Sequence, residues 1–356
     1  MAAPTRRERT VGCLLGGALG DALGAPVEFM EWAEIERRYG SDGIRGFAPA
    51  YGGLGRVTDD TQMTLFTAEG LMRAQHRRAK GGVLEADVAL HRAYLRWLFT
   101  QFGDAGAVPW DRETGPDASG WLLEQEFLHH PRAPGTTCLS ALRSGTMGSP
   151  RTALNDSKGC GGVMRVAPVG LTSSESFDLG CEAAAITHGH PTGWLAAGAF
   201  AQIISDLMKG RSLREAVESA VARCESAQAG GETAAALRRS LGLADRANAP
   251  TPDQIELLGG GWVAEEALAI SVYCALGADE PGTAIFAAVN HSGDSDSTGS
   301  ITGNILGAAF GSGWLDAELV GQLEGRETIE QVAKDLDDAF FGRVPVDVDW
   351  DRYPPW

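Results

Sequence analysis

The sequence predicts an all-α fold, a compact orthogonal bundle of a dozen or more helices. Apolar residues recur at steps of three and four along most of the chain, which is the period of an amphipathic helix. The alternation typical of strands is nearly absent, with VPVDVDW at residues 344–350 as the exception. Several helical segments are rich in Ala and Gly, so we expect their backbones to pack closely.

The first predicted helix covers the apolar residues 11–19, which follow a basic start. Such a start superficially resembles a secretory signal. The apolar stretch is short and glycine-rich, however, and Asp21 follows it at once, so we expect a helix of the mature protein. Further helices are predicted, in chain order, over residues 58–79, 85–102, 176–188, 192–210, 212–227, 262–277 and 328–342.

Two segments between these helices lack a clear period. Residues 103–120 should form a long loop, and loops of that length inside domains are often functional. Residues 226–251 are polar and Ala-rich, which indicates an exposed excursion. The chain has no Pro/Ser-rich linker and no repeat of fixed period, so we expect a single domain over residues 1–356.

Composition and charge exclude several functional classes. The 356 residues are 44% hydrophobic and 22% charged, as in an ordinary globular protein rather than a disordered one. The net charge of −17 argues against nucleic acid as a partner. No segment approaches the roughly 20 apolar residues that span a bilayer, so no membrane partner is expected. Six scattered cysteines without a CxxC motif favour free thiols in a reducing cytoplasm.

Two acidic segments each begin a predicted helix, and their excess of carboxylates suggests metal binding. Capping explains either segment alone, because Thr, Ser and Asp are favoured N-caps and first-turn carboxylates suit the helix dipole. A cap needs only one oxygen, however, and like charges disfavour each other unless a positive group lies between them. If the segments converge, their oxygens suit Mg²⁺, Mn²⁺ or Ca²⁺ rather than zinc or copper. A pair of ions would also orient a substrate and activate water. The candidate metal ligands are Thr58, Asp59, Asp60, Asp294, Asp296 and Ser297.

Three other motifs have both a structural and a functional interpretation. The glycine-rich residues 155–168 could bind an anion through backbone N–H groups, with Lys158 adding positive charge, although the residues alone favour a structural turn. His188 and His190 lack partners for zinc and could cap the end of a helix. Glu28, taken from the residues alone, is expected to be solvated at the end of a packing helix.

The chain resembles the ADP-ribosylglycohydrolase family over about residues 10–311. This family includes dinitrogenase-reductase-activating glycohydrolases and eukaryotic ADP-ribosylhydrolases. Each shared motif is modest alone, but the joint occurrence in one order is highly specific. The C-terminal helix and tail, residues 312–356, lie outside the resemblance. The five motifs are GGALGDALGAPVE, TDDTQMTL, SKGCGGVMRVAP, ITHGHP and SGDSDSTGSITGNILGA.

The resemblance implies a fold that holds two Mg²⁺ (or Mn²⁺) ions at the base of a cleft, where they bind the distal ribose of ADP-ribose. The six candidate ligands named above would hold the ions, and Asp60 and Asp296 would take part in catalysis. Many relatives have threonine where this chain has Ser297, and serine keeps the hydroxyl. Glu28 falls on a glutamate that is a candidate general base. Asp117 lies where some bacterial members carry a loop aspartate proposed to act on the leaving group.

The resemblance also implies a binding loop for the diphosphate at residues 157–162. Some relatives have asparagine where this chain has Cys160. The aromatic residue that stacks on adenine is not placed by the resemblance. The expected substrate-binding residues are Ser157, Lys158, Gly159, Gly161, Gly162 and His188.

These expectations combine into a binuclear-metal-dependent hydrolase that acts on an ADP-ribosylated protein and releases ADP-ribose. The expected bond is the N-glycosidic linkage to arginine, a preference that rests on the wording GDSDSTG and on family analogy. Hydrolysis of serine-linked, O-acetyl- or nucleobase-linked ADP-ribose remains an alternative. Another is a non-catalytic ADP-ribose binder, since the family includes crystallin-like members. Those usually lose acidic ligands, and this chain keeps them, which argues for activity.

Overall fold

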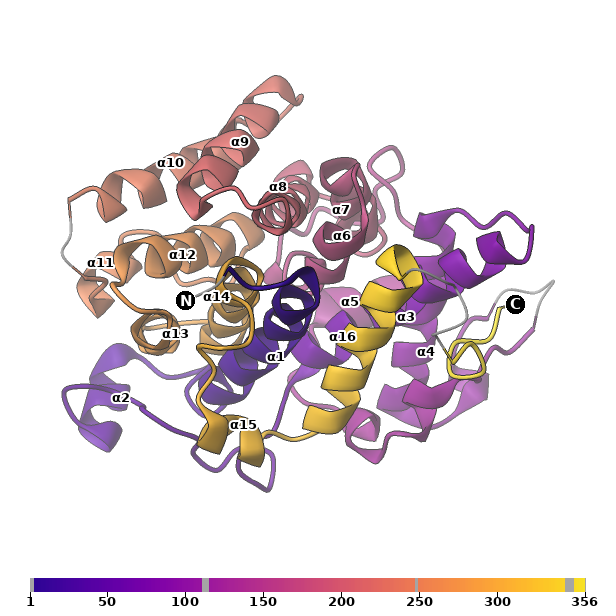
Figure 1. Ribbon diagram of the computed structural model, residues 1–356, viewed down its shortest axis with the longest axis horizontal. Coiled ribbons are helices and arrows are strands. Elements are labelled where there is room, and N and C mark those ends of the chain that lie inside the picture. Colours follow the sequence, from indigo (N-terminus) through magenta and orange to yellow (C-terminus); the bar gives the residue numbers. More distant parts are fainter. Residues whose placement is uncertain (1–2, 111–114, 247–248, 343–348, 356) are drawn as a thin grey trace.

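Two helices from opposite ends of the sequence, α1 (Arg6–Gly24) and α14 (Ser295–Phe310), pack along each other in the middle of the structure (Figure 1). The computed structural model describes residues 3–110, 115–246, 249–342 and 349–355. Glycines allow the two backbones to touch, because a methyl group at Gly20 would overlap the backbone carbonyl of Gly299. Gly24 likewise faces the backbone of Ser295 and Asp296. The close contact therefore places the first turn of α14 beside the end of α1.

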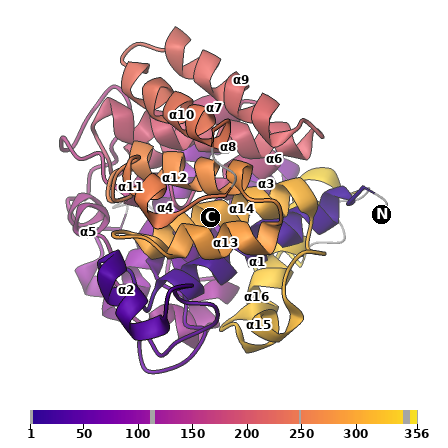
Figure 2. The same cartoon turned by 90° about the vertical axis from the view of Figure 1, so that its left-hand side faces the viewer.

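Other helices cover this central pair on both sides (Figures 1 and 2). The helices α12 (Ala264–Gly277) and α13 (Pro281–Val289) contact α14 on one side, and α16 (Arg326–Phe341) contacts α1 on the other. The long helix α3 (Asp59–Ala79) packs against α16 and against α4 (Ala86–Phe102). The remaining α-helices are α2 (Trp32–Tyr39), α5 (Thr136–Arg143), α6 (Ala167–Thr172), α7 (Ser176–Ala185), α8 (Pro191–Met208), α9 (Leu213–Ser226), α10 (Gly231–Ala244), α11 (Pro252–Glu256) and α15 (Ala317–Gln322).

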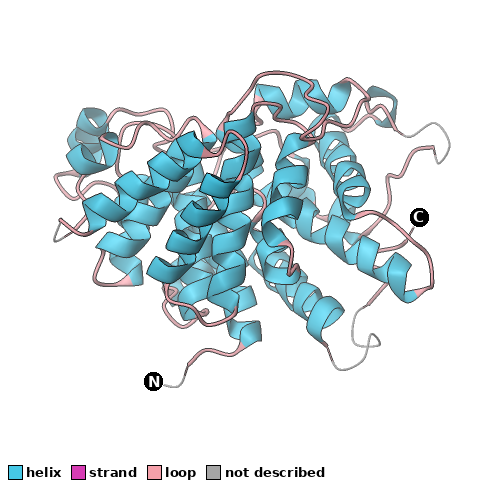
Figure 3. Ribbon diagram, turned by 90° about the horizontal axis from the view of Figure 1, so that it is seen from above, coloured by secondary structure: helices cyan, strands magenta, loops and turns pink. Residues whose placement is uncertain are grey.

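The predicted all-α fold is confirmed (Figure 3). The described residues contain sixteen α-helices, short 3-10 turns and isolated bridges, but no β-strand. Every helix predicted from the sequence is present, with ends within a few residues of those expected. Most of the strand-like segment 344–350 lies outside the described residues. In the described ranges, no helix combines the length and apolar character needed to cross a bilayer.

The segment 226–251 was wrongly predicted as an exposed excursion. It contains α10, which packs against α12 and buries Thr233, Ala236 and Leu237. The apolar face of α10 consists partly of alanine and threonine, which give a weak periodic signal in the sequence.

Candidate active site

A cleft of about 370 Å³ brings the two acidic segments together. Its walls come from the first turns of α3 and α14, the residues that follow α1, the start of α5, and the loop before α12. Thr58 is buried directly before α3 and is not part of the cleft lining. The acidic and hydroxyl side chains on the lining are Glu28, Asp59, Asp60, Thr136, Thr137, Asp294, Asp296 and Ser297.

The first turn of α3 is held in place by a carboxylate from α1. Thr58 caps the helix by accepting a hydrogen bond from the backbone N–H of Asp60 at 3.3 Å. The backbone N–H of Thr58 donates to the Asp21 carboxylate at 3.0 Å, and that of Thr61 does so at 3.1 Å. Burial raises the pKa of Asp21 to about 6, although these hydrogen bonds oppose the rise. Asp21 therefore fixes the position of Asp59 and Asp60 without lining the cleft.

The first turn of α14 combines capping with contacts to the other acidic segment. Asp294 caps the helix and accepts a hydrogen bond from the backbone N–H of Ser297 at 3.3 Å. The Ser297 hydroxyl donates to Asp60 Oδ2 at 3.4 Å, which directly joins α14 to α3. Asp296 lies on the same turn and also faces the cleft. Both acidic segments therefore cap their helices, and their carboxylates still converge.

Burial and mutual repulsion raise the free energy of the ionised form of this carboxylate cluster. Burial raises the pKa of Asp59, Asp60 and Asp296 well above the usual range, and neighbouring carboxylates raise it further. Burial and the charges of Asp294 and Asp59 raise the pKa of Glu28 to about 9. The expectation of a solvated Glu28 is wrong, because only 6% of this residue is exposed.

The cluster has the chemistry of a site for hard cations, although its ligands are not pre-assembled. Asp60 Oδ1 and Glu28 Oε2 are buried and have no hydrogen-bond partner in the described part of the chain. Unpaired carboxylate oxygens of this kind suit Mg²⁺ or Mn²⁺, which take oxygen ligands. Among the described residues, however, no three His, Cys, Asp or Glu side chains form a complete group that could hold a metal ion. The donor set fits the cations chemically, and metal binding is therefore a proposal.

The protonation of this cluster predicts how the stability of the metal-free protein changes with pH. An unfolded glutamate titrates near pH 4.3, whereas the pKa of Glu28 is raised to about 9 in the folded protein. Between these values the folded state holds a proton that the unfolded chain has released. The free energy of unfolding in chelator should therefore fall as the pH rises from about 4 to about 9.

Thermal unfolding in chelator at several pH values measures this dependence. Glu28→Gln should flatten the fall relative to Glu327→Gln, which removes the same charge from a side chain that is 90% exposed. Equal slopes for the two variants would show that Glu28 does not hold the extra proton.

The predicted substrate loop partly lines the cleft. Gly159, Cys160 and Gly161 contribute to the lining, and backbone hydrogen bonds from Cys160 N–H to Trp262 O (3.1 Å) and from Ala264 N–H to Lys158 O (2.8 Å) fasten the loop to the start of α12. A methyl group at Gly161 would come within 2.9 Å of the Cys138 sulfur, so only glycine fits there without displacement. The loop is therefore fixed before any ligand binds.

The side chain of His188 packs against this glycine-rich loop. The side chain is 2% exposed, lines the cleft and lies against Gly161 and Gly162. Burial, followed by the Arg165 charge, lowers the pKa of His188 to about 3, so the imidazole is neutral at physiological pH. His190 was expected at the end of a helix, but its Nδ1 accepts the Thr192 N–H at 3.1 Å and so caps the start of α8.

Lys158 and Ser157 do not reach the cleft lining. The Lys158 ammonium forms ion pairs with Glu232, at 2.7 Å, and with Glu265, so its charge is already balanced. The Ser157 hydroxyl hydrogen-bonds the Thr137 hydroxyl at 3.1 Å. From this position the Lys158 ammonium is not placed to form an ion pair with an anion bound in the cleft.

Asp117 lies in a buried ion-pair network instead of the cleft. Its carboxylate pairs with Arg96 and, at 3.5 Å, with Arg73, and both arginines pair with Glu69 at 2.8 Å. The two arginines and two carboxylates balance in charge, and Asp117 is not part of the cleft lining. The expected role of Asp117 on a leaving group is not supported by this position. The sequence could not predict the position of Asp117, because its ion pairs join a loop to residues of α3 and α4.

Breaking this network should destabilise the protein strongly. Arg96→Met leaves the fully buried Glu69 with one partner fewer, and the loss of one member of a buried ion pair costs about 3–5 kcal/mol. Urea unfolding monitored by circular dichroism measures the change. Arg214→Met is the control, because Arg214 and Asp245 are 42% and 60% exposed and such pairs contribute about 0–1 kcal/mol. Equal losses for both variants would contradict a structural role for the network.

Two aromatic side chains at the edge of the cleft were not predicted as functional. Phe29 and Trp262 are 72% and 44% exposed, and their rings stack with centroids 5.6 Å apart. Both contribute to the cleft lining. The available sequence signal was the tryptophan that directly follows three glycines at residues 259–261.

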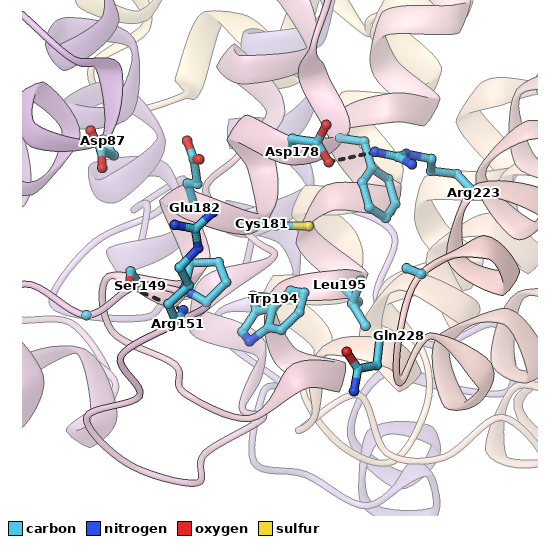
Figure 4. A pocket seen from close by; sticks show the side chains of 14 residues that line it. Asp87, Ser149, Arg151, Asp178, Cys181, Glu182, Trp194, Leu195, Arg223 and Gln228 are labelled. Carbon is cyan, nitrogen blue, oxygen red and sulfur yellow. Dashed lines mark hydrogen bonds and ion pairs between the residues drawn. The ribbon is translucent and has the colours of Figure 1, made fainter.

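A larger cavity of about 590 Å³ lies elsewhere, between α7, α8, the end of α9 and the loop residues 148–151 (Figure 4). It contains acidic and basic side chains in similar numbers, and Asp178 pairs with Arg223 at 2.7 Å. It does not have the buried excess of carboxylates that characterises the smaller cleft. We therefore assign the candidate active site to the smaller cleft.

Comparison with known sequences matches the chain along nearly its whole length. A sequence profile described as ADP-ribosylglycohydrolase matches residues 2–345, which extends beyond the expected segment 10–311. An uncharacterised protein of Archaeoglobus fulgidus is 28% identical over 342 residues, covering 92% of this chain and 96% of that protein. The ADP-ribosyl-[dinitrogen reductase] glycohydrolase of Rhodospirillum rubrum is 26% identical over 332 residues, covering 88% of this chain and 92% of that enzyme.

The fold is also similar to that of a solved structure. A chain of an "ADP-ribosylglycohydrolase-related protein complex" superposes with a TM-score of 0.66 at 24% identity, covering 94% of this chain and 99% of that one. At this identity the likeness establishes the fold alone, whereas the profile match covers almost every residue and establishes the family. The chain thus belongs to the ADP-ribosylglycohydrolase family.

Proposed function

We propose that the acidic cleft hydrolyses the bond between ADP-ribose and a side chain of an ADP-ribosylated protein, and that this bond is the N-glycosidic linkage to arginine. The observation that carries the proposal is the convergence of Glu28 with the acidic turns of α3 and α14 in one cleft, with buried carboxylate oxygens left unpaired. The Rhodospirillum rubrum relative, whose name states a glycohydrolase activity on ADP-ribosyl-dinitrogen reductase, supports the same reaction class.

Two Mg²⁺ or Mn²⁺ ions would be held by Asp59, Asp60, Asp294, Asp296 and Ser297, which line the cleft. Thr58, also expected as a ligand, caps α3 beside them and does not line the cleft. When bound, such ions supply positive charge and orient the hydroxyls of the distal ribose. The chain's own contribution is to fix these oxygens. Asp21 anchors the turn that carries Asp59 and Asp60, and the packing of α1 against α14 holds the opposite turn beside it.

Glu28 is the proposed general base. Its carboxylate lines the cleft, and its buried Oε2 has no hydrogen-bond partner among the described residues, so it can accept a proton from a water in the cleft. Cations beside Glu28 would oppose the rise of its pKa that burial and the charges of Asp294 and Asp59 cause, and would keep the carboxylate ionised near neutral pH. In the proposed reaction, a water attacks the anomeric carbon and Glu28 takes its proton.

An arginine linkage fits this site because of the charge of the leaving group. An ADP-ribosylated guanidinium is cationic and departs as a neutral guanidine, which is basic enough to take a proton from water without a dedicated acid. The absence of Asp117 from the cleft is therefore no obstacle. The net charge of −17 also favours approach of a cationic segment of a protein substrate.

The rest of the ligand would lie along the outer cleft. The glycine-rich turn at Gly161 lines the cleft and is suited to the diphosphate, and neutral His188 holds the loop in place. The N–H groups of Gly159 and Cys160 already donate to Ser157 Oγ and Trp262 O. Trp262 and Phe29 offer an exposed aromatic surface on which adenine could stack. All six cysteines are free, which supports the proposed location in a reducing cytoplasm.

A panel of defined linkages tests the proposal. We expect release of ADP-ribose from an arginine conjugate with Mg²⁺ or Mn²⁺ and loss of release in excess chelator. Release from serine- or O-acetyl-linked ADP-ribose, but not from the arginine conjugate, would contradict the proposed arginine linkage. Full turnover in chelator would overturn the metal requirement. Calorimetry that detects ADP-ribose binding without any turnover would instead identify a non-catalytic binder.

A further inference from the structure

A thiol lies in contact with the carboxylate cluster. Cys160 begins the short 3-10 turn Cys160–Gly162, lines the cleft, and has its sulfur 2.8 Å from Asp294 Oδ2. Its backbone N–H donates to Trp262 O at 3.1 Å, so the position of the turn is fixed by the segment that precedes α12. The sulfur therefore faces the same space as the acidic oxygens.

Two other residues that line this cleft have carboxylate oxygens without a hydrogen-bond partner in the described structure. Asp60 is 2% exposed, lines the same cleft, and has its Oδ1 without a hydrogen-bond partner in the described structure. The second unpaired oxygen, Glu28 Oε2, belongs to another lining residue. A cation drawn to these oxygens would thus find a sulfur atom at the edge of the site.

Sulfur changes which cations the site can hold. Magnesium and manganese take oxygen ligands, whereas zinc and cadmium take thiolate ligands readily. We propose that Cys160, together with Asp294, forms a binding site for a thiophilic divalent cation, Zn²⁺ or Cd²⁺, at the edge of the carboxylate cluster. The inference rests on the proposed function of this cleft as a cation site.

The chemistry of the thiol differs between the two classes of ion. With a thiophilic ion, a sulfur–metal bond forms and the thiol proton leaves to solvent. With Mg²⁺ or Mn²⁺, Cys160 keeps its proton and continues to donate a hydrogen bond to Asp294, as in the structure. The same cleft would then accept two classes of cation in competition, and a thiophilic ion would exclude the ions of the proposed reaction.

A second cysteine in the same cleft provides a matched control. Cys138 also contributes to the lining, but its sulfur lies 3.6 Å from Arg165 Nη1. The guanidinium charge beside that sulfur repels a metal ion. We therefore expect Cys138 not to bind metal.

The experiment is a titration of the metal-free, full-length protein with Cd²⁺, followed by the ultraviolet sulfur-to-cadmium charge-transfer band. Wild type and Cys138→Ala should gain a band that saturates at one equivalent. Cys160→Ser should lose the band, and its affinity for Cd²⁺ should fall by more than the roughly 10–100-fold that loss of a group supporting a metal ligand costs. Cys160→Asn is the second variant, should Cys160→Ser fail to fold by circular dichroism.

Mn²⁺ binding, measured by the loss of the free-ion electron paramagnetic resonance signal, separates this inference from the proposed function. Added Cd²⁺ should release bound Mn²⁺ from wild type. Mn²⁺ binding with no sulfur band, or a band that persists in both Cys160 variants, would overturn the inference alone. Binding of neither ion would overturn the cation site on which both proposals rest.

Discussion

Replacement of Asp60 by asparagine should abolish ADP-ribose release and, at the same time, stabilise the metal-free protein. Asparagine has the same shape and can still accept the hydrogen bond that the Ser297 hydroxyl donates to Asp60. It removes, however, one of the buried carboxylates whose pKa is raised by burial and by Asp59. Without cations this charge opposes folding, and with cations it is needed as a ligand.

The expected loss of activity is about 100-fold or more, since loss of even the groups that support metal ligands typically costs 10–100-fold. ADP-ribose release measures the first effect, and thermal unfolding in chelator near pH 8 measures the second. Asp253→Asn, which removes a charge from an exposed residue of α11, is the control and should change neither quantity appreciably. An Asp60→Asn protein that is less stable than wild type in chelator would indicate that Asp60 is a purely structural residue.

Replacement of Gly20 by alanine should destabilise the protein, although alanine normally stabilises a helix. The added methyl group would overlap the Gly299 carbonyl of α14, so the two central helices must move apart. Overpacking of this kind costs about 1–3 kcal/mol. Because the same contact positions the acidic turn of α14, ADP-ribose release should fall as well.

The same substitution in another helix provides the control. Gly242 lies in α10, and a methyl group there would meet nothing within 4 Å. Gly242→Ala should therefore stabilise the protein by about 0.4–1 kcal/mol, because it restricts the unfolded chain. Urea unfolding of both variants measures whether each substitution raises or lowers the free energy of unfolding. A stabilising effect of Gly20→Ala would contradict the close packing of α1 on α14.

The sequence predicted the acidic site better than its surroundings for a physical reason. An excess of carboxylates beyond what capping needs is visible in the sequence, and the structure brings Asp59, Asp60, Asp294 and Asp296 into one cleft. The partners of single charges are not visible in this way. Lys158 and Asp117 each form ion pairs with residues of elements distant in the sequence, and these ion pairs hold both side chains away from the cleft.

Residues that support the site were also missed. Asp21 is a lone carboxylate inside a glycine-rich apolar helix, and its role is visible only in the structure, where α3 begins against it. The helical periodicity of the apolar residues predicted most of the long helices, because long amphipathic segments have a strong periodic signal. It failed for α10, whose buried face contains small residues.

The pairing of α1 with α14 has a consequence for biosynthesis. The first helix leaves the ribosome early, but the surface on which it packs is not translated until about residue 310. At 5–20 residues per second, the nascent chain must carry an unpaired, glycine-rich N-terminal helix for roughly 15–60 s. Contacts between such remote segments also slow folding. The cleft can therefore be assembled only after α14 has been synthesised, and ribosome-associated chaperones would have this interval in which to bind α1.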